Sequence, residues 1–420
     1  MKLKPAVALY VAATLLCAAT VAAQRASAPT QSRELSAAGK AALTHQLSDS
    51  VHRGDAPGIA ALVVDREGVL FEGAAGQLDI AKGTPMPANA IFSIASMTKP
   101  VTSVAIMMLM EAGKLSLDDP VSKHLDGYDN LQVIATFNDK DATYTTRPAR
   151  KAMTIRQLLA HTSGIGYSFT NPIEFALVNK TQKGEWEQPL LNDPGDVWHY
   201  SASTRVLGFI VEAVTKTPLE NWYHEHIFAP LGMNNTSYAV ATAKQPRLAP
   251  QYRRASGKLE TLPKTPIAST PTPPYRGDGG LYSTMEDYSK FVRMLIGGGS
   301  LGPVKILSPA SVKMMGENQI GAIFVETQPA VVPERTRPMP LGAGKDKFGL
   351  GFQIASHDPA NAKFRSPGSM SWAGLFNTEF WIDPVRQIGG IHMMQQLPFY
   401  DEGAIRALRG FEEIVYKELR

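Results

Sequence analysis

Ser96 and Lys99 are the residues of this chain whose types and spacing most clearly suggest chemistry, because they could form a nucleophile and its base. Pro100 fits the first turn of a helix that begins near Ser96, and Gly113 fits its end. Ser96 and Lys99 would then share one helix face, with Cβ atoms roughly 5–6 Å apart. Burial and the positive end of the helix both disfavour an ammonium, so Lys99 could accept the serine proton. The helix itself is predicted from apolar residues at three- and four-residue spacing: Val101, Val104, Ala105, Met108 and Leu109.

The segment from Ser96 to Lys99 fits equally well a helix cap followed by a solvated lysine, so further residues must decide between the two interpretations. Tyr200 is one of them, since it lies between a Pro194-Gly195 turn and a predicted helix over 203–217. At this junction its phenol could face a cleft, and a neighbouring cationic lysine would lower its pKa and suit it to proton transfer. The alternative is a boundary tyrosine that only packs its ring.

A third candidate is Trp372-Ala373-Gly374, which is predicted to open a strand that runs on to Thr378 and ends at Pro384. Small residues at the start of an edge strand let a substrate carbonyl approach backbone N–H groups, as an oxyanion hole requires. The alternative is ordinary sheet packing by Trp372.

The N-terminal residues predict a signal peptide over 1–23. Lys2 and Lys4 form a basic start, residues 6–16 are apolar, and residues 21–23 are small. The apolar run is too short and alanine-rich for a secure membrane span, so we expect a periplasmic or secreted protein with no span in its mature form. The single cysteine, Cys17, follows Leu16, which makes a lipid anchor unfavourable. The mature chain would then have no disulfide, thiol nucleophile or Cys-ligated metal. No nucleic acid is expected, since there is no basic block. No metal or cofactor is expected either.

The order of the predicted elements indicates an α/β (α+β) fold with an antiparallel sheet flanked by helices. Residues 24–420 would form one domain, with a sheet lobe over about 36–130 and 275–420 and a mainly helical lobe over about 131–274 inserted in it. The cleft between the lobes is the expected ligand site. The loops 319–345 and 261–274 are expected to border it. Strands are predicted at 58–65, 69–73, 348–354, 371–382 and 389–395, and helices at 35–53, 154–160, 203–217, 285–296, 308–316 and 401–419.

Five motifs in this order resemble those of the serine beta-lactamase-like superfamily, which contains class C beta-lactamases, DD-peptidases and family VIII carboxylesterases. The resemblance spans about residues 36–415 and implies the fold of that superfamily. It rests on Ser96-Met97-Thr98-Lys99, Leu159-Ala160-His161-Thr162-Ser163-Gly164, Tyr200-Ser201-Ala202-Ser203 with Val206-Leu207-Gly208, Asp278-Gly279-Gly280-Leu281, and Trp372-Ala373-Gly374 with Phe380-Trp381-Ile382-Asp383-Pro384.

The resemblance implies a role for each matching residue. Ser96 would be the acylated nucleophile, Lys99 its base partner and Tyr200 the proton shuttle, while the N–H groups of Ser96 and Leu375 would form the oxyanion hole. The implied substrate-binding residues are Trp372, Ala373, Gly374 and Ala202.

Two substrate-binding positions depart from the pattern of the lactamases and peptidases. Ala202 stands where they usually have Asn, and Trp372-Ala373-Gly374 stands where they usually have Lys-Thr-Gly. Losing an amide and a cation should favour neutral acyl groups, as in the esterases with the tryptophan motif.

Two other patterns in the chain offer competing chemistry. Ser300 lies in a G-x-S-x-G pattern, but a helix precedes it and Pro303 follows, so we interpret it as a turn and not a nucleophile elbow. The pair His224 and His226 has no partner cluster that would indicate zinc.

The leading hypothesis is an exported serine hydrolase that acts on a small-molecule ester through an acyl-enzyme. A beta-lactamase or D-amino-acid peptidase acting on an amide is the alternative among enzymes. A penicillin-recognising binding protein without useful turnover is the alternative of another class. A chromogenic ester tested beside a chromogenic cephalosporin would separate these hypotheses.

Overall fold

An inner strand of the large sheet, β1 (Gly58–Asp65), is buried along its whole length. Its two neighbours in the sheet come from opposite ends of the chain. It pairs antiparallel with β2 (Val69–Asp79) on one side and with β16 (Ile388–Met393) on the other. The full sheet has the order β12-β13-β14-β15-β16-β1-β2-β3, with antiparallel pairing throughout. This confirms the predicted antiparallel sheet. The remaining strands are β3 (Thr84–Pro85), β12 (Lys347–Phe348), β13 (Gln353–Ile354), β14 (Met370–Gly374) and β15 (Thr378–Asp383).

This computed structural model describes residues 33–263, 266–357 and 363–420, so the predicted signal peptide and Cys17 lie outside the described residues. Residues 35–419 form one compact unit. Over the described ranges, no helix has both the length and the apolar character needed to cross a membrane.

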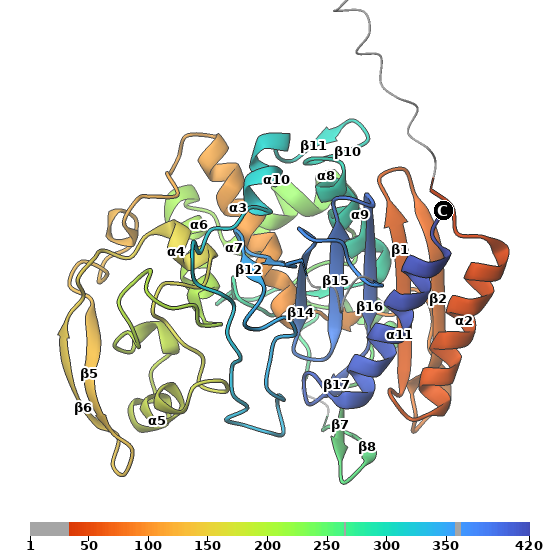
Figure 1. Cartoon of the computed structure of the whole chain (residues 1–420), viewed down its shortest axis with the longest axis horizontal. Coiled ribbons are helices and arrows are strands. Elements are labelled where there is room, and N and C mark those ends of the chain that lie inside the picture. The colour runs from red at the N-terminus through yellow and green to blue at the C-terminus, as the bar shows by residue number, and fades with distance from the viewer. Residues whose placement is uncertain (1–32, 264–265, 358–362) are drawn as a thin grey trace, which may run out of the picture. The chain divides into compact units, whose positions relative to one another are not determined.

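Helices cover both faces of the sheet because side chains alternate along its strands. Ile59, Ala61 and Val63 of β1 face a core closed by α2 (Ala37–His52) and α11 (Glu402–Glu418), the two helices that Figure 1 shows together at the outer side of the sheet. The alternate residues of β1 face a larger core that includes α9 (Met285–Ile296) and α3 (Thr98–Glu111). α3 packs in turn on α6 (Ser203–Thr215), and so the helix that follows Ser96 connects the sheet to the inserted segment.

The inserted segment, residues 131–274, contains more strand than the sequence predicted. It holds α4 (Ile155–Leu159), α5 (Pro172–Thr181), α7 (Leu219–Tyr223) and α8 (Ala229–Leu231), but also two hairpins. β5 (Gln132–Asn138) and β6 (Thr143–Pro148) form the hairpin at the left of Figure 1, in a segment where we predicted no strand. β6 is rich in threonine, whose branched side chain favours strands even when exposed. The second hairpin joins β7 (Tyr252–Ala255) and β8 (Lys258–Thr261).

Two predicted strands of the C-terminal third are each divided by a turn. The segment 371–382 forms β14 and β15, joined through Leu375, Phe376 and Asn377. Asn377 has φ +58° and its buried amide donates to the carbonyls of Gln396 and Pro398, so the side chain stabilises a turn that has no glycine or proline. The segment 348–354 likewise divides into β12 and β13. The shorter elements are α10 (Pro309–Met315) and the strands β4 (Phe92–Ser93), β9 (Tyr282–Ser283), β10 (Ser300–Leu301), β11 (Val304–Lys305) and β17 (Gln396–Leu397).

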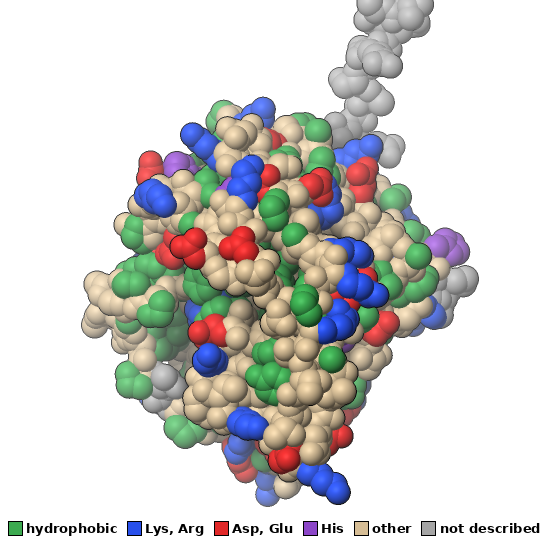
Figure 2. Space-filling model, turned by 90° about the vertical axis from the view of Figure 1, so that its left-hand side faces the viewer, with side chains coloured by type: hydrophobic (Ala, Val, Ile, Leu, Met, Phe, Trp, Pro, Cys, Tyr) green, Lys and Arg blue, Asp and Glu red, His purple; other side chains and the backbone are tan. Residues whose placement is uncertain are grey.

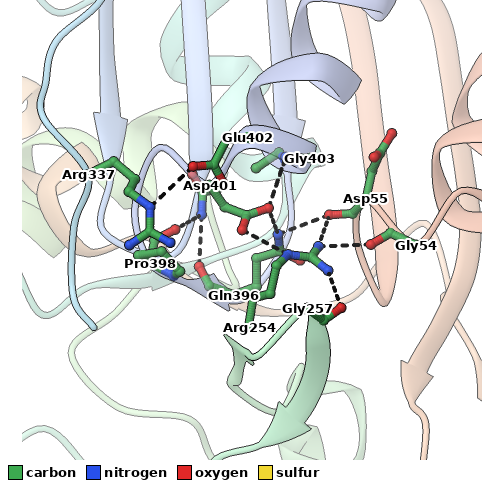
Figure 3. Close-up of polar contacts among 12 residues, drawn as sticks. Gly54, Asp55, Arg254, Gly257, Arg337, Gln396, Pro398, Asp401, Glu402 and Gly403 are labelled. Atoms are coloured by element: carbon green, nitrogen blue, oxygen red, sulfur yellow. Dashed lines mark hydrogen bonds and ion pairs between the residues drawn. The ribbon is translucent and has the colours of Figure 1, made fainter. Parts of the chain in front are cut away.

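A polar network ties the second hairpin to the start of α11 and to the residues before β1 (Figure 3). Arg254 of β7 donates to the buried carboxylate of Asp401 at 2.8 Å and to the carbonyls of Gly54 and Asp55. Asp401 also caps α11, and Gln396 donates to both Asp401 and the Asp55 carbonyl. The network fixes both ends of the loop that leads into α11.

Candidate active site

A cavity of about 240 Å³ contains both Ser96 and Tyr200 in its wall. Trp372, Ala373, Gly374 and Leu375 line it as well, and it is therefore the place where most of the predicted site residues meet. On β14, the neighbouring strand β13 pairs with Met370 and Ser371 only. On the side that faces β13, residues 372–374 of β14 therefore have no strand neighbour. β14 is thus an inner strand of the sheet with an open end, and not the outermost strand that the sequence suggested.

Ser96 lies in η1 (Ala95–Met97), a short 3-10 turn that leads directly into α3. The preceding residue, Ala95, has φ +43°, a left-handed conformation that is unfavourable for alanine and often found beside functional groups. Gly374 approaches this segment so closely that a Cβ there would lie 2.3 Å from the carbonyl oxygen of Ile94. Glycine is therefore needed where β14 meets the turn that carries Ser96.

Lys99 is buried in the first turn of α3, and its amine has three polar neighbours. Nζ lies 3.2 Å from Ser96 Oγ, 3.0 Å from the Tyr167 hydroxyl and 2.7 Å from the carbonyl oxygen of Asp278. Burial lowers the pKa of Lys99 to about 7, against the opposing effect of the Asp278 carboxylate. A substantial fraction of Lys99 is therefore neutral at neutral pH, and able to accept a proton.

Tyr200 donates a hydrogen bond of 2.6 Å to Ser96 Oγ, so the serine oxygen contacts both candidate proton-transfer groups. Our expectation of a lowered phenol pKa was wrong, because burial raises the pKa of Tyr200 well above its ordinary value. Tyr200 is thus a neutral phenol that can donate a proton, and Lys99 is the group whose charge is labile.

An aromatic cluster holds the Tyr200 ring in place. Its ring centroid lies 5.0 Å from that of Trp372, 5.3 Å from that of His161 and 5.1 Å from that of Tyr167. His161 is buried with φ +56°, and its Nδ1 is 2.9 Å from Ser201 Oγ. Burial lowers the pKa of His161 well below its usual value, so the motif histidine is neutral and supports the tyrosine.

Tyr167 and Asp278, for which no role was predicted, are the other two polar neighbours of the Lys99 amine. Tyr167 donates to Asp278 Oδ2 at 2.6 Å, and Asp278 also pairs with Arg205 and Arg276. Although burial alone would raise it, Lys99 and the two arginines hold the pKa of Asp278 below its ordinary value. Tyr167 follows the 159–164 motif by three residues, and Asp278 is the first residue of the 278–281 motif. Both residues could therefore have been predicted from the sequence as members of the site.

Not every predicted residue or loop belongs to the cavity wall. Ala202 is fully buried at the N-terminus of α6, where its N–H donates to the Gly166 carbonyl. It does not line the cavity. The 319–345 loop contributes Arg335 and residues 339–342 to the wall, as expected. The described residues of 261–274 contribute nothing to it, and that prediction was wrong.

The two competing patterns lie outside the cavity wall. Ser300 belongs to β10, which pairs with β11 in a tight hairpin just after α9. His224 and His226 follow α7, and no group of three His, Cys, Asp or Glu side chains within the described ranges is arranged to hold a metal. Figure 2 shows the face with β5 and β6, where acidic, basic and hydrophobic side chains are intermingled.

Several known proteins are similar to this chain along most of its length. Residues 41–412 match the family model described as Beta-lactamase. Protein Rv1367c of Mycobacterium tuberculosis is 34% identical, over 84% of this chain and 89% of its own length. Monacolin J acid methylbutanoyltransferase of Aspergillus terreus is 27% identical, over 80% of this chain and 84% of its own. Esterase EstB of Burkholderia gladioli is 25% identical, over 78% and 82%. The solved structure of a simvastatin synthase mutant from Aspergillus terreus matches with a TM-score of 0.77 and 26% identity, over 91% of this chain and 98% of its own.

Proposed function

The chain belongs to the beta-lactamase family, and from this premise we propose that it is an exported serine hydrolase that cleaves esters of small acyl groups through an acyl-enzyme on Ser96. The observation that carries the proposal is the double contact of Ser96 Oγ, with Tyr200 at 2.6 Å and Lys99 at 3.2 Å. A nucleophile, a base of lowered pKa and a neutral acid meet there at one atom.

In the proposed acylation, neutral Lys99 removes the Ser96 proton. A neutral amine has two N–H bonds, which its contacts with the Asp278 carbonyl and the Tyr167 hydroxyl can use. Its lone pair is then free to accept the hydroxyl proton of Ser96. Ser96 Oγ attacks the ester carbonyl, and the backbone N–H groups of Ser96 and Leu375 stabilise the resulting oxyanion.

Tyr200 completes the proposed cycle as the proton donor to the departing alcohol. Its phenol keeps its proton at neutral pH and gives it to the alcohol. Lys99, which contacts the same Ser96 oxygen as Tyr200, then returns the proton taken from Ser96 to the phenolate. Water then attacks the acyl-enzyme by the same path in reverse, which regenerates Ser96 and releases the acid.

An ester substrate is supported by the two departures from the lactamase pattern and by the similarity to esterase EstB. The position of the amide-binding asparagine is the buried Ala202, and Trp372 adds aromatic surface to the cavity where a cation would attract the carboxylate of an antibiotic. Turnover of nitrophenyl esters of graded acyl length, a chromogenic cephalosporin and a D-alanyl dipeptide tests the proposal. Efficient cephalosporin or dipeptide hydrolysis with negligible ester turnover would overturn it, and stoichiometric labelling of Ser96 without any turnover would indicate a binding protein.

Acyl transfer to an alcohol is a second candidate function, favoured by the similarity to a methylbutanoyltransferase. Both reactions share the acyl-enzyme and differ only in the acceptor that resolves it. Supplying a nitrophenyl ester together with a series of primary and secondary alcohols distinguishes them. A transferase would yield the new ester in excess over the free acid, whereas a hydrolase would yield mainly the acid.

A further inference from the structure

Within the described part of the chain, four arginines line the cavity that contains Ser96. Arg276 pairs with Asp278, while Arg365 and Arg409 both bind the buried carboxylate of Glu412. The fourth, Arg335, is exposed and has no carboxylate partner among the described residues, and its guanidinium lies over an aromatic ring. Arg335 is therefore the arginine of the cavity wall that pairs with no carboxylate of the described residues.

Arg335 is held at the cavity wall from two directions. Its guanidinium carbon lies 5.3 Å from the ring centroid of Phe169, and its carbonyl accepts a hydrogen bond of 2.8 Å from the N–H of Phe399. Phe169 in turn packs on Tyr167, with ring centroids 4.9 Å apart, and on Tyr200 at 6.4 Å. One aromatic ring thus separates the free guanidinium from the tyrosines next to Ser96.

We propose that Arg335 is an anion subsite that binds a carboxylate carried by the ester substrate. A guanidinium presents a planar set of N–H donors that matches a carboxylate, and its stacking on Phe169 leaves those edge donors available. The inference rests on the proposed ester hydrolysis and specifies the substrate class: small esters with an acidic group on either the acyl or the alcohol part. It revises the expectation of neutral substrates, because Arg335 places on a loop the cation that β14 lacks.

The carboxylates of the cavity wall do not oppose this assignment. Asp278 pairs with Arg205 and Arg276. Burial raises the pKa of Asp346, whose carboxyl group accepts hydrogen bonds from Gln353 and Ser356. Burial raises the pKa of Glu379 to about 7, so this carboxyl group is largely protonated below neutral pH. Burial thus disfavours negative charge on Asp346 and Glu379, and the carboxylate of Asp278 is already paired.

Arg337 provides a matched control two residues along the same loop. Its guanidinium binds Glu402 at 3.3 Å and the Pro333 carbonyl at 2.9 Å, and it does not line the cavity. Replacing it by glutamine removes the same charge from the same loop without touching the proposed subsite.

The test compares three esters: neutral nitrophenyl butyrate, nitrophenyl hemiglutarate with its carboxylate on the acyl part, and a carboxynitrophenyl butyrate with its carboxylate on the leaving group. For Arg335→Gln we expect kcat/KM to fall about tenfold for the ester whose carboxylate reaches the subsite, mainly through KM, and to stay unchanged for the neutral ester. Arg335→Glu should invert the preference, and added salt should weaken the discrimination by the wild type. Whichever charged ester responds identifies the part of the substrate that carries the acid.

Equal losses for all three esters in Arg335→Gln, or equal effects of Arg335→Gln and Arg337→Gln, would overturn the proposal. If no ester is turned over at all, the proposed function fails and binding still decides the subsite. A carboxyphenylboronic acid should then bind the wild type more tightly than phenylboronic acid, and Arg335→Gln should abolish that difference. No difference between the two boronic acids in the wild type would also overturn the proposal.

Discussion

Lys99 Nζ donates a hydrogen bond of 2.7 Å to the backbone carbonyl of Asp278, so the main chain positions the candidate base. The carboxylate of the same residue is occupied by Tyr167, Arg205 and Arg276. Position and charge environment of the amine are thus set by different atoms of one residue, and they can be altered separately.

The first prediction uses this separation. Asp278→Asn removes a negative charge that raises the pKa of Lys99, so the pKa should fall below its present value of about 7. Since only the neutral amine acts as base, the acidic limb of the kcat/KM profile should move to lower pH. Arg276→Gln removes a cation that lowers the same pKa, and should move the limb to higher pH. Shifts in the same direction would contradict the assignment of Lys99 as the base.

The second prediction concerns the nucleophile. Ser96→Ala should abolish covalent labelling by a fluorophosphonate and lower turnover by several orders of magnitude, because no other group can form the acyl-enzyme. Ser300→Ala is the control, and should leave labelling intact and activity within a few-fold. Labelling lost in Ser300→Ala and retained in Ser96→Ala would refute the site.

The third prediction tests the proton path. Lys99→Ala and Tyr200→Phe should each lower kcat by about 10²–10⁴-fold, the usual size of general acid–base effects. The double variant should lose little more than the worse single variant, since both groups serve one relay. Fully additive losses, measured on one nitrophenyl ester, would show instead that the two residues act independently.

The fourth prediction concerns export. Expressed in a bacterial host, the mature protein should begin near Gln24 and be recovered outside the cytoplasm without detergent. N-terminal sequencing and fractionation check this. A lipid-modified Cys17, or protein released only by detergent, would be the contrary result.

The fifth prediction addresses stability. The Asp401 side chain is fully buried and both binds Arg254 and caps α11. Asp401→Ala leaves Arg254, whose side chain is 18% exposed, without its carboxylate and should lower the unfolding free energy by about 3–5 kcal/mol. The neighbouring Glu402 is 71% exposed, and Glu402→Ala should stay within about 0.5 kcal/mol. Denaturant unfolding of the two variants measures both effects. Equal losses would mean that the network in Figure 3 contributes nothing specific.

The elements that the sequence predicted well are those with a strong local pattern. The helix at 285–296 agrees at both ends because one face is apolar and Thr284 caps it, and the 58–65 strand is an uninterrupted apolar run. The β5–β6 hairpin buries only Val133, so no hydrophobic alternation revealed it. The turn at Asn377 was missed since its stability comes from carbonyls some twenty residues away.

In the candidate site as well, contacts within one helix could be predicted and contacts between distant segments could not. Ser96 and Lys99 are three residues apart, and a helix alone brings them together. Tyr167 reaches Lys99 across 68 residues and Asp278 reaches Tyr167 across 111, contacts that depend on the completed fold. The same dependence on distant contacts explains the error about the Tyr200 pKa: the neighbouring lysine was foreseen, but the aromatic rings that bury the phenol were not.

The pairing of β1 with β16 determines when the sheet can be completed during synthesis. Synthesis delivers β1 and β2 early, but the other edge of β1 waits for residues 388–393, and α2 waits for its partner α11. Contacts between such distant segments form slowly, because the long intervening chain must first be brought together. The N-terminal part therefore cannot complete its core while the ribosome is still adding residues. A chain whose sheet closes only at its last strands stays unfolded during synthesis, which is the state that the export we propose would require.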